Sequence, residues 1–227
     1  MTANQLSEKL LLAVKMQNPT NELVAVLRAF PIGQLEKELA NDTQKKAFWI
    51  NCYNAFFQIL RKEKNLVKPE IYREKHSYIA GQKLSLDDME HGILRKYWYK
   101  YSLGFLPNLF AGRTIKKWAV DEIDYRIHFA LNCGAESCPP IAFYHPNRLE
   151  QQLDMATLSF LEGETDVFLD KKEIHVTRLF QWFLADFGGM AGVRQILQDK
   201  LNIDTNDSKI VFKAYSWKEE LDNFVSP

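Results

Sequence analysis

Cysteine, net charge and long apolar runs are what this 227-residue sequence has least of. Its 29 basic and 29 acidic residues cancel, and a general nucleic-acid-binding protein normally has a basic surplus, so we expect no nucleic-acid partner. No apolar run reaches the roughly 18 residues of a membrane-spanning helix, so we expect no membrane segment. Two of the three cysteines, Cys133 and Cys138, lie in one short loop. That concentration is the most unusual feature of the chain.

The N-terminus also lacks the pattern of a signal peptide. Its apolar run, residues 10–14, has five residues and lies between Lys9 and Lys15. A secretory signal needs a longer apolar region and a cleavage site of small residues. We therefore expect a soluble, cytoplasmic protein. A reducing compartment argues against a permanent disulfide.

The periodicity of apolar residues predicts a helix-rich α+β protein with a small antiparallel sheet. Hydrophobic residues make up 46% of the chain, enough for a sizeable core. No linker or repeat divides it, so we expect a single domain over residues 1–227, with a helical N-terminal part over 1–40. Ser85 and Asp88 resemble a helix start, preceded by a short hairpin or strand. We expect helices over residues 6–14, 21–30, 42–64, 86–99, 148–161, 177–183 and 193–201, and strands over 126–131, on both sides of a tight turn at 170–172, and over 209–215.

The helix over residues 42–64 is apolar nearly all round, which is typical of a helix buried at the centre of a fold. Asp42 or Thr43 can cap its start. Asn51, Asn54 and Gln58 are its polar exceptions and share one face. They either tie the helix to loop backbones or line a cleft, because an unpartnered buried amide costs about 1–3 kcal/mol.

The segment "EHGILR" places His91 and Arg95 four residues apart, on one helical face, with Glu90 beside them. One interpretation is a surface pair, or a network that holds the cysteine loop. The other is a general base next to an anion-binding guanidinium. Asp186 near a helix end is unfavourable for the helix dipole, so we expect it to pair with Arg126 or Arg95.

The loop "HFALNCGAESCPPI" offers small residues that free backbone amides, with Ser137 as a further donor. Catalysis by cysteine needs a thiolate, formed beside a histidine or at helix-terminal amides. Three other interpretations stay open: buried packing of both cysteines, a disulfide between Cys133 and Cys138, and a zinc site. Zinc would need His128, His91 or Glu90 as further ligands, and the C-x4-C spacing matches no common zinc knuckle.

Four segments occur in one order: "FWINCYNAFF", "LSLDDMEHGILR", "DYRIHFALNCGAESCPPI" and "RLFQWFLADFG". In these the chain resembles the family called domain of unknown function 547, over about residues 45–190. The resemblance implies no settled activity. The residues that match the family's motifs are Asn51, Tyr53, Asn54, Glu90, His91, Arg95, Arg126, His128, Cys133, Ser137, Cys138, Pro139, Asp186 and Phe187.

The central helix is also similar to that of papain-like and transglutaminase-like folds, where a cysteine lies near the helix start. Cys52 lies mid-helix here, so the usual nucleophile would be missing. This is an analogy of fold alone, and it says nothing of activity by itself. If it holds, the protein is either an enzyme with a relocated thiol or a non-catalytic relative.

Three functional hypotheses follow. The first is a cysteine-dependent hydrolase or acyl transferase, with Cys138 as nucleophile and Cys133 as the second choice. His128 or His91 would be its base, and Asn51 or Asn54 would orient that base or donate a hydrogen bond to an oxyanion. The second is a non-catalytic binding or scaffold domain that uses the same cleft. The third is a redox-active thiol pair, which requires the two cysteines to be bonded or nearly so. We expect a small molecule or peptide as partner, and no metal or other cofactor. The expected binding residues are Asn51, Asn54, Glu90, Arg95, Arg126 and Ser137.

Overall fold

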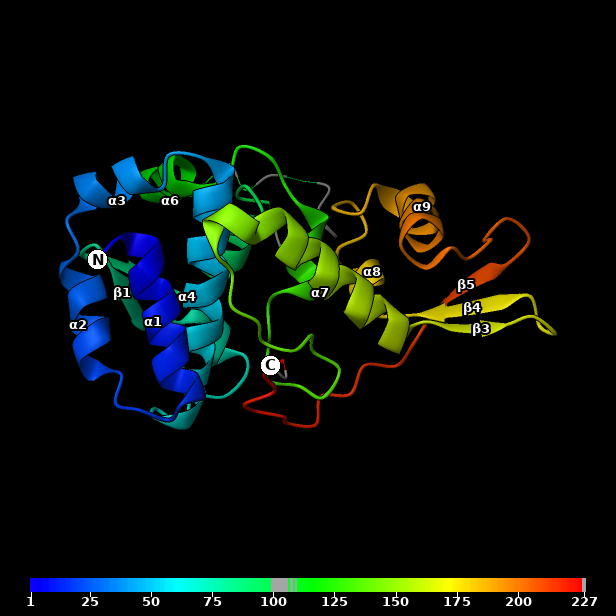
Figure 1. Cartoon of the computed structure of the whole chain (residues 1–227), viewed down its shortest axis with the longest axis horizontal. Helices are drawn as coiled ribbons and strands as arrows, with labels where there is room; N and C mark the ends of the chain where they lie inside the picture. The colour runs from blue at the N-terminus through cyan, green and yellow to red at the C-terminus, as the bar shows by residue number, and fades with distance from the viewer. Residues whose placement is uncertain (99–105, 107, 109, 226–227) are drawn as a thin grey trace.

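A long central helix, α4 (Asp42–Lys62), organises the N-terminal half of the protein. In the computed structural model, which describes residues 1–98, 106, 108 and 110–225, helices α1 (Ala3–Lys15), α2 (Asn21–Ala29) and α3 (Ile32–Glu38) lie around it (Figure 1). Its N-cap is Asn41, whose side chain accepts a hydrogen bond from the Gln44 amide, and not the expected Asp42 or Thr43.

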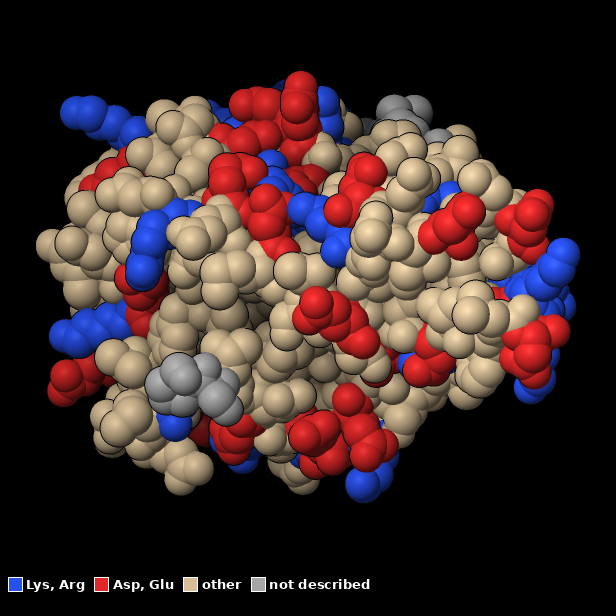
Figure 2. All heavy atoms as spheres, turned by 45° about the vertical axis from the view of Figure 1, so that its right-hand side comes forward, with Lys and Arg blue, Asp and Glu red and all other residues tan. Residues whose placement is uncertain are grey.

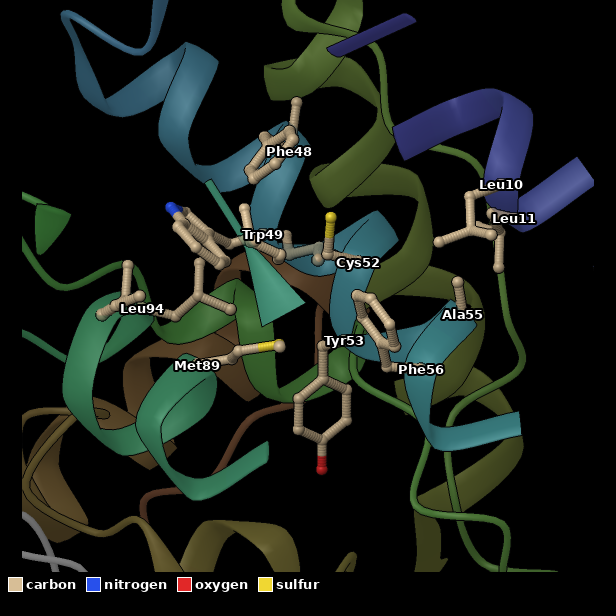
Figure 3. Packing of buried hydrophobic residues seen from close by; sticks show 14 of the residues in the cluster. Leu10, Leu11, Phe48, Trp49, Cys52, Tyr53, Ala55, Phe56, Met89 and Leu94 are labelled. Atoms are coloured by element: carbon tan, nitrogen blue, oxygen red, sulfur yellow. The ribbon is translucent and has the colours of Figure 1, made fainter. Parts of the chain in front are cut away.

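The middle of α4 is buried on every side, as its sequence predicts. In Figure 3, Cys52 lies among apolar side chains of the core, and its thiol is free and fully buried. Burial raises the pKa of this thiol well above its usual value, so Cys52 is a packing residue. Tyr53 differs, because its hydroxyl points away from the labelled apolar cluster (Figure 3).

After α4 the chain forms α5 (Glu70–Arg73) and a short hairpin of β1 (Ser77–Ile79) and β2 (Gln82–Leu84). The expected capping of the next helix is confirmed. The Ser85 amide donates to the Asp88 carboxylate and the Asp88 amide donates to the Ser85 hydroxyl. The helix itself differs from the prediction, because η1 (Asp88–Leu94) is a π-helix. Tyr99, the predicted end, lies outside the described residues.

The strand predicted over residues 126–131 is wrong. Residues Tyr125–Phe129 form a 3-10 helix, η3, whose first turn is capped by the Asp124 side chain on the Arg126 amide. The following backbone is not paired in a ladder, because the Asn54 side chain takes the Ala130 carbonyl and the Asn132 amide. Ile127, His128 and Phe129 of η3 are therefore buried in succession and do not alternate between two faces as the residues of a strand do.

The C-terminal half packs around a second apolar cluster that includes Phe129, Phe160, Phe180 and Phe187. After η1 the elements follow in the order α6, which packs on the first cluster, η3, a 3-10 turn η4, α7, β3, β4, α8, α9 and β5 (Figure 1). β3 and β4 are antiparallel, whereas β4 and β5 are parallel, so this sheet is mixed and not purely antiparallel. The bounds are α6 Arg113–Trp118, η4 Pro146–Arg148, α7 Leu149–Glu164, β3 Asp166–Phe168, β4 Glu173–Val176, α8 Leu179–Trp182, α9 Gly189–Leu201 and β5 Lys209–Phe212.

Beyond β5 the chain turns back along the cysteine loop (Figure 1). The Glu136 amide donates to the Lys218 carbonyl at 2.8 Å, and the Ser216 amide donates to the Ser137 hydroxyl at 2.9 Å. These contacts fix the returning segment, residues 213–225, against residues 134–141. The segment thereby carries Tyr215 and Trp217 to the cysteines.

The expected helix-rich α+β architecture is thus confirmed. None of the helices in the described part of the chain has both the length and the apolar character of a membrane span. Basic and acidic side chains occur together across the face shown in Figure 2, in keeping with the zero net charge.

Candidate functional site: a pocket that contains the cysteine pair

Cys133 and Cys138 are joined by a disulfide bond, with their Cα atoms 6.0 Å apart. The sequence analysis expected a reducing compartment to disfavour a disulfide, whereas the structure contains this bond. Gly134, directly after Cys133, has a φ of +70°. A Cβ there would lie 2.4 Å from the Phe57 ring, so only glycine fits this turn beside α4.

Tyr215 is the side-chain partner of the disulfide. Its hydroxyl oxygen lies 3.1 Å from each sulfur, and the Cys133 amide donates to the Cys138 sulfur at 3.0 Å. A disulfide carries no S–H, so the tyrosine must be the donor. Burial raises the pKa of Tyr215, which keeps the phenol protonated. Cys133 is partly exposed, whereas Cys138 is 4% exposed.

The disulfide lies in the wall of a pocket with a volume of about 560 Å³. This pocket is mostly apolar, with a few polar groups that converge on it, as is usual for a small-molecule site. Its aromatic lining residues are Tyr53, Tyr72, Trp182, Phe183, Tyr215 and Trp217. Its lining residues with a carboxyl, guanidinium or imidazole group are Arg73, Asp87, Glu90, His91 and His128.

A buried ion-pair network extends behind the pocket. Asp186 accepts hydrogen bonds from Arg95 Nε at 2.6 Å and Nη2 at 3.0 Å, and it lies 2.8 Å from His128 Nε2. The predicted pairing of Asp186 with an arginine is confirmed, and the partner is Arg95. Arg95 Nη1 also lies 2.8 Å from His91 Nδ1. A guanidinium only donates, so Nδ1 of His91 carries no proton there. His91 and Arg95 thus belong to a largely buried network with Asp186 and are not an exposed surface pair.

The charges of this network follow from burial and pairing. Burial alone would raise the pKa of Asp186, but the hydrogen bonds from His128 and Arg95 outweigh it and lower that pKa to about 2. Burial lowers the pKa of His128 despite its carboxylate partner. His128 is therefore neutral at pH 7, with its proton on Nε2 toward Asp186 and its Nδ1 able to accept a proton.

Glu90 is a carboxyl group of the pocket whose pKa is strongly shifted by burial. Burial raises its pKa to about 7, Asp87 adds to this, and Arg95 and the Tyr53 hydroxyl oppose it. The Tyr53 hydroxyl donates to Glu90 Oε2 at 3.2 Å. A carboxyl group with a pKa near 7 can gain or lose a proton at neutral pH, as a general acid or base must.

The two expected asparagines do not line the pocket. Asn51 exchanges two hydrogen bonds with the backbone of Tyr144, at 2.8 and 3.0 Å. Asn54 joins the Ala130 carbonyl to the Asn132 amide, each at 2.9 Å. Both tie α4 to loop backbones, which was one of the two alternatives considered for this face.

Arg126 and Ser137 also lie outside the pocket. Arg126 binds Asp124 at 2.8 Å and Glu150 at 2.6 Å, in an ion-pair cluster between η3 and α7. The Ser137 hydroxyl accepts from the Ser216 amide and so fixes the returning segment. Among the candidate residues, the structure places Cys133, Cys138, His91, His128 and Glu90 together, with Arg95 directly behind them.

The sequence did not indicate the aromatic half of the pocket. Trp182 and Phe183 have the large apolar side chains typical of core residues, but both are partly exposed and line the pocket. Tyr215 is the last residue of the strand predicted over 209–215, but β5 ends at Phe212, so Tyr215 and Trp217 both lie in the returning segment. The clustering of two aromatic residues in "AYSW" was the one available signal.

The contacts in the pocket bear on two of the chemical interpretations, a cysteine–histidine pair and a metal site. Within the described part of the chain, neither sulfur has a hydrogen bond to an imidazole nitrogen, so the disulfide-bonded state contains no cysteine–histidine pair. The described residues also bring no three histidine, cysteine, aspartate or glutamate side chains into a metal-binding group.

A family model described as protein of unknown function, DUF547, matches residues 37–161. The chain belongs to this family. The match covers α4, the Glu90–Arg95 segment and the cysteine loop, and the fourth motif, "RLFQWFLADFG", follows it in sequence. No curated protein and no solved structure matches the chain. This DUF547 protein therefore has its pocket residues both inside and outside the matched range.

Proposed function

We propose that Cys133 and Cys138 form a redox centre that exchanges its disulfide with the thiol of a small molecule or peptide. The observation that carries the proposal is the double contact of Tyr215, which donates toward both sulfurs on the wall of a pocket. A disulfide that only held the loop together would need neither a pocket nor a hydroxyl donor on its sulfurs.

The exchange starts at Cys133, because its sulfur belongs to the more exposed of the two residues. A substrate thiolate attacks Cys133 Sγ, the S–S bond breaks, and its electron pair leaves on Cys138 Sγ. The Cys133 amide and the Tyr215 hydroxyl both lie in position to donate to the resulting thiolate. Charge-assisted hydrogen bonds of this kind stabilise the leaving group and so speed the exchange.

A second substrate thiolate then attacks the substrate sulfur of the mixed disulfide. This releases the substrate disulfide and leaves Cys133 reduced. Two thiols have lost two protons and two electrons, and the cysteine pair has gained both. A disulfide of the same class reverses the sequence and restores the bond. A pair that cycles in this way fits the cytoplasmic location expected from the sequence, because the bond is transient.

Mass spectrometry of the native protein tests this proposal. The folded protein is mixed with 2-mercaptoethanol, and free thiols are trapped with iodoacetamide at successive times. We expect a mixed disulfide at Cys133 and an alkylated Cys138, formed faster than in an oxidised peptide of residues 128–141. If the bond stays intact until the protein unfolds, the cysteine pair is not a redox centre, and the pocket is then a binding site.

The second candidate is the cysteine-dependent hydrolase or acyl transferase, and it concerns the reduced protein. It is favoured by His128, which lines the same pocket as Cys138 and is oriented by Asp186, as the base of a catalytic triad is. Cys138 would be the nucleophile, and His128 or His91 the base. The likeness of the core to papain-like folds belongs to this candidate. A burst of product from an activated ester, seen with reduced but not with oxidised protein, would support it.

A further inference from the structure

Three aromatic rings lead from the disulfide to the mouth of the pocket. The ring centroids of Tyr215 and Trp217 are 4.6 Å apart, those of Trp182 and Tyr215 are 4.7 Å apart, and Trp182 stacks on Trp217 at 5.5 Å. We call these three residues the aromatic cluster. Tyr215 also contacts both sulfurs, so a group bonded to Cys133 lies next to the cluster.

Trp217 is 53% exposed, which is unusual for a tryptophan beside a pocket. The ammonium of Lys68 lies 3.8 Å from the centre of its ring. Lys68 as a whole is exposed, but the loss of water around its ammonium at the ring lowers the pKa of Lys68 to about 8. The Lys68 ammonium thus lies over part of the Trp217 ring and regains full hydration when it moves away. A ligand can therefore replace Lys68 on the ring at low cost.

Charge does not select the ligand of this pocket. Asp87 and Glu90 line it, but so does Arg73, and Lys68 lies at the aromatic cluster. Because the pocket is lined by charges of both signs, we expect apolar and aromatic contact to be the main source of affinity.

We propose that the substrate thiol carries an aromatic ring a few bonds from its sulfur, and that this ring replaces Lys68 on the aromatic cluster during exchange at Cys133. This inference rests on the proposed redox function and names its substrate class. A small thiol without a ring would react at the same sulfur but would gain nothing from Trp217. The preference for a ring therefore measures the aromatic cluster and not the disulfide.

A matched series of thiols tests the inference on the full-length native protein. The series is 2-phenylethanethiol, 2-cyclohexylethanethiol and 2-mercaptoethanol, each compared with its rate on the oxidised peptide of residues 128–141. After that correction, we expect 2-phenylethanethiol to react at least about tenfold faster than 2-mercaptoethanol, with 2-cyclohexylethanethiol between them. Trp217→Ala should reduce this preference, whereas Leu169→Ala, on the exposed tip between β3 and β4, should not.

NMR of the Lys68 ammonium gives a second readout that needs no reaction. A non-reacting analogue, 2-phenylethanol, should return the pKa of Lys68 toward the ordinary lysine value, because it moves the ammonium into water. Equal corrected rates for the three thiols would overturn the inference and leave the redox function standing. Failure of all three thiols to react with the folded protein would overturn both.

Discussion

The hydroxyl oxygen of Tyr215 lies 3.1 Å from the sulfur of Cys138. The two residues are 77 positions apart in the chain, and the contact exists because the returning segment, residues 213–225, is hydrogen-bonded along the cysteine loop. This contact places a proton donor at the sulfur that leaves in the proposed exchange. Four predictions follow from the pocket around it.

Tyr215→Phe removes the donor and keeps the ring. We expect the exchange rate with 2-mercaptoethanol to fall roughly 10- to 100-fold, because a hydrogen bond to a charged group contributes roughly 1.5–3 kcal/mol. The pKa of the Cys138 thiol in the reduced protein should rise for the same reason, which pH-dependent alkylation measures. Tyr78→Phe, in β1 and outside the pocket, is the control. Equal rates for Tyr215→Phe and the native protein would show that the contact has no role in exchange.

The two cysteines should behave differently when each is replaced alone. Cys138→Ser leaves Cys133 partly exposed, so this variant should be captured by an oxidised small-molecule disulfide as a stable adduct. Cys133→Ser leaves the buried Cys138, which we expect to react at least several-fold more slowly. Intact-mass measurement of adduct against time checks both. The opposite order would mean that Cys138 is the attacked sulfur.

The rate of exchange should depend on the ionisation of Glu90. Its pKa is raised to about 7, so the carboxyl is mostly neutral below pH 6 and mostly negative above pH 8. A negative charge in the pocket disfavours an attacking thiolate, and the rate per substrate thiolate should therefore fall several-fold across this interval. Glu90→Gln should remove the step. A step that survives in Glu90→Gln would have to come from another group.

Asp186 should stabilise the fold at neutral pH and not in acid. Its folded pKa of about 2 lies below the ordinary value of 3.8, so the folded state favours the carboxylate. The stabilisation is fully present above the unfolded pKa and is lost as the pH falls through the folded pKa. Integrated over the shift, the loss is about 2 kcal/mol in the free energy of unfolding between pH 5 and pH 2.

Urea unfolding over that pH interval measures this contribution. Asp186→Asn should lower stability at pH 7, because Arg95 is left buried without its carboxylate, and should flatten the acid part of the profile. Asp170→Asn, in the exposed turn between β3 and β4, serves as the matched control. An unchanged acid profile in Asp186→Asn would place the acid-sensitive group elsewhere.

Much of the helical architecture could be predicted because its apolar residues follow a helical period. Helices α1 and α2 are examples. The buried helix α4 could be predicted because it is apolar nearly all round, and the hairpin of β3 and β4 because a tight turn separates two strand-like runs. The pairing of Asp186 with an arginine could be predicted too, because a carboxylate near a helix end opposes the helix dipole. The choice between the two candidates could not, and the structure pairs Asp186 with Arg95 and Arg126 with Asp124. The segment over residues 126–131 could not, because Asn54, far away in sequence, binds the backbone groups that a strand would pair.

Part of the candidate pocket could be predicted from the sequence. Cys133, Cys138, His91, His128 and Glu90 carry their chemistry in the residue type and lie in the pocket as a group. The aromatic cluster escaped prediction because it depends on a long-range contact. Trp182 reads as a core residue until the returning segment places Tyr215 and Trp217 beside it.

The most direct measurement is a redox titration of the folded protein in glutathione buffers, with the state of Cys133 and Cys138 read by alkylation and mass spectrometry. A working redox pair should reach equilibrium while the protein stays folded, with a midpoint above about −300 mV, the level below which structural disulfides usually lie. A pair that stays oxidised across the whole range, or that is reduced only as the protein unfolds, would contradict the redox function.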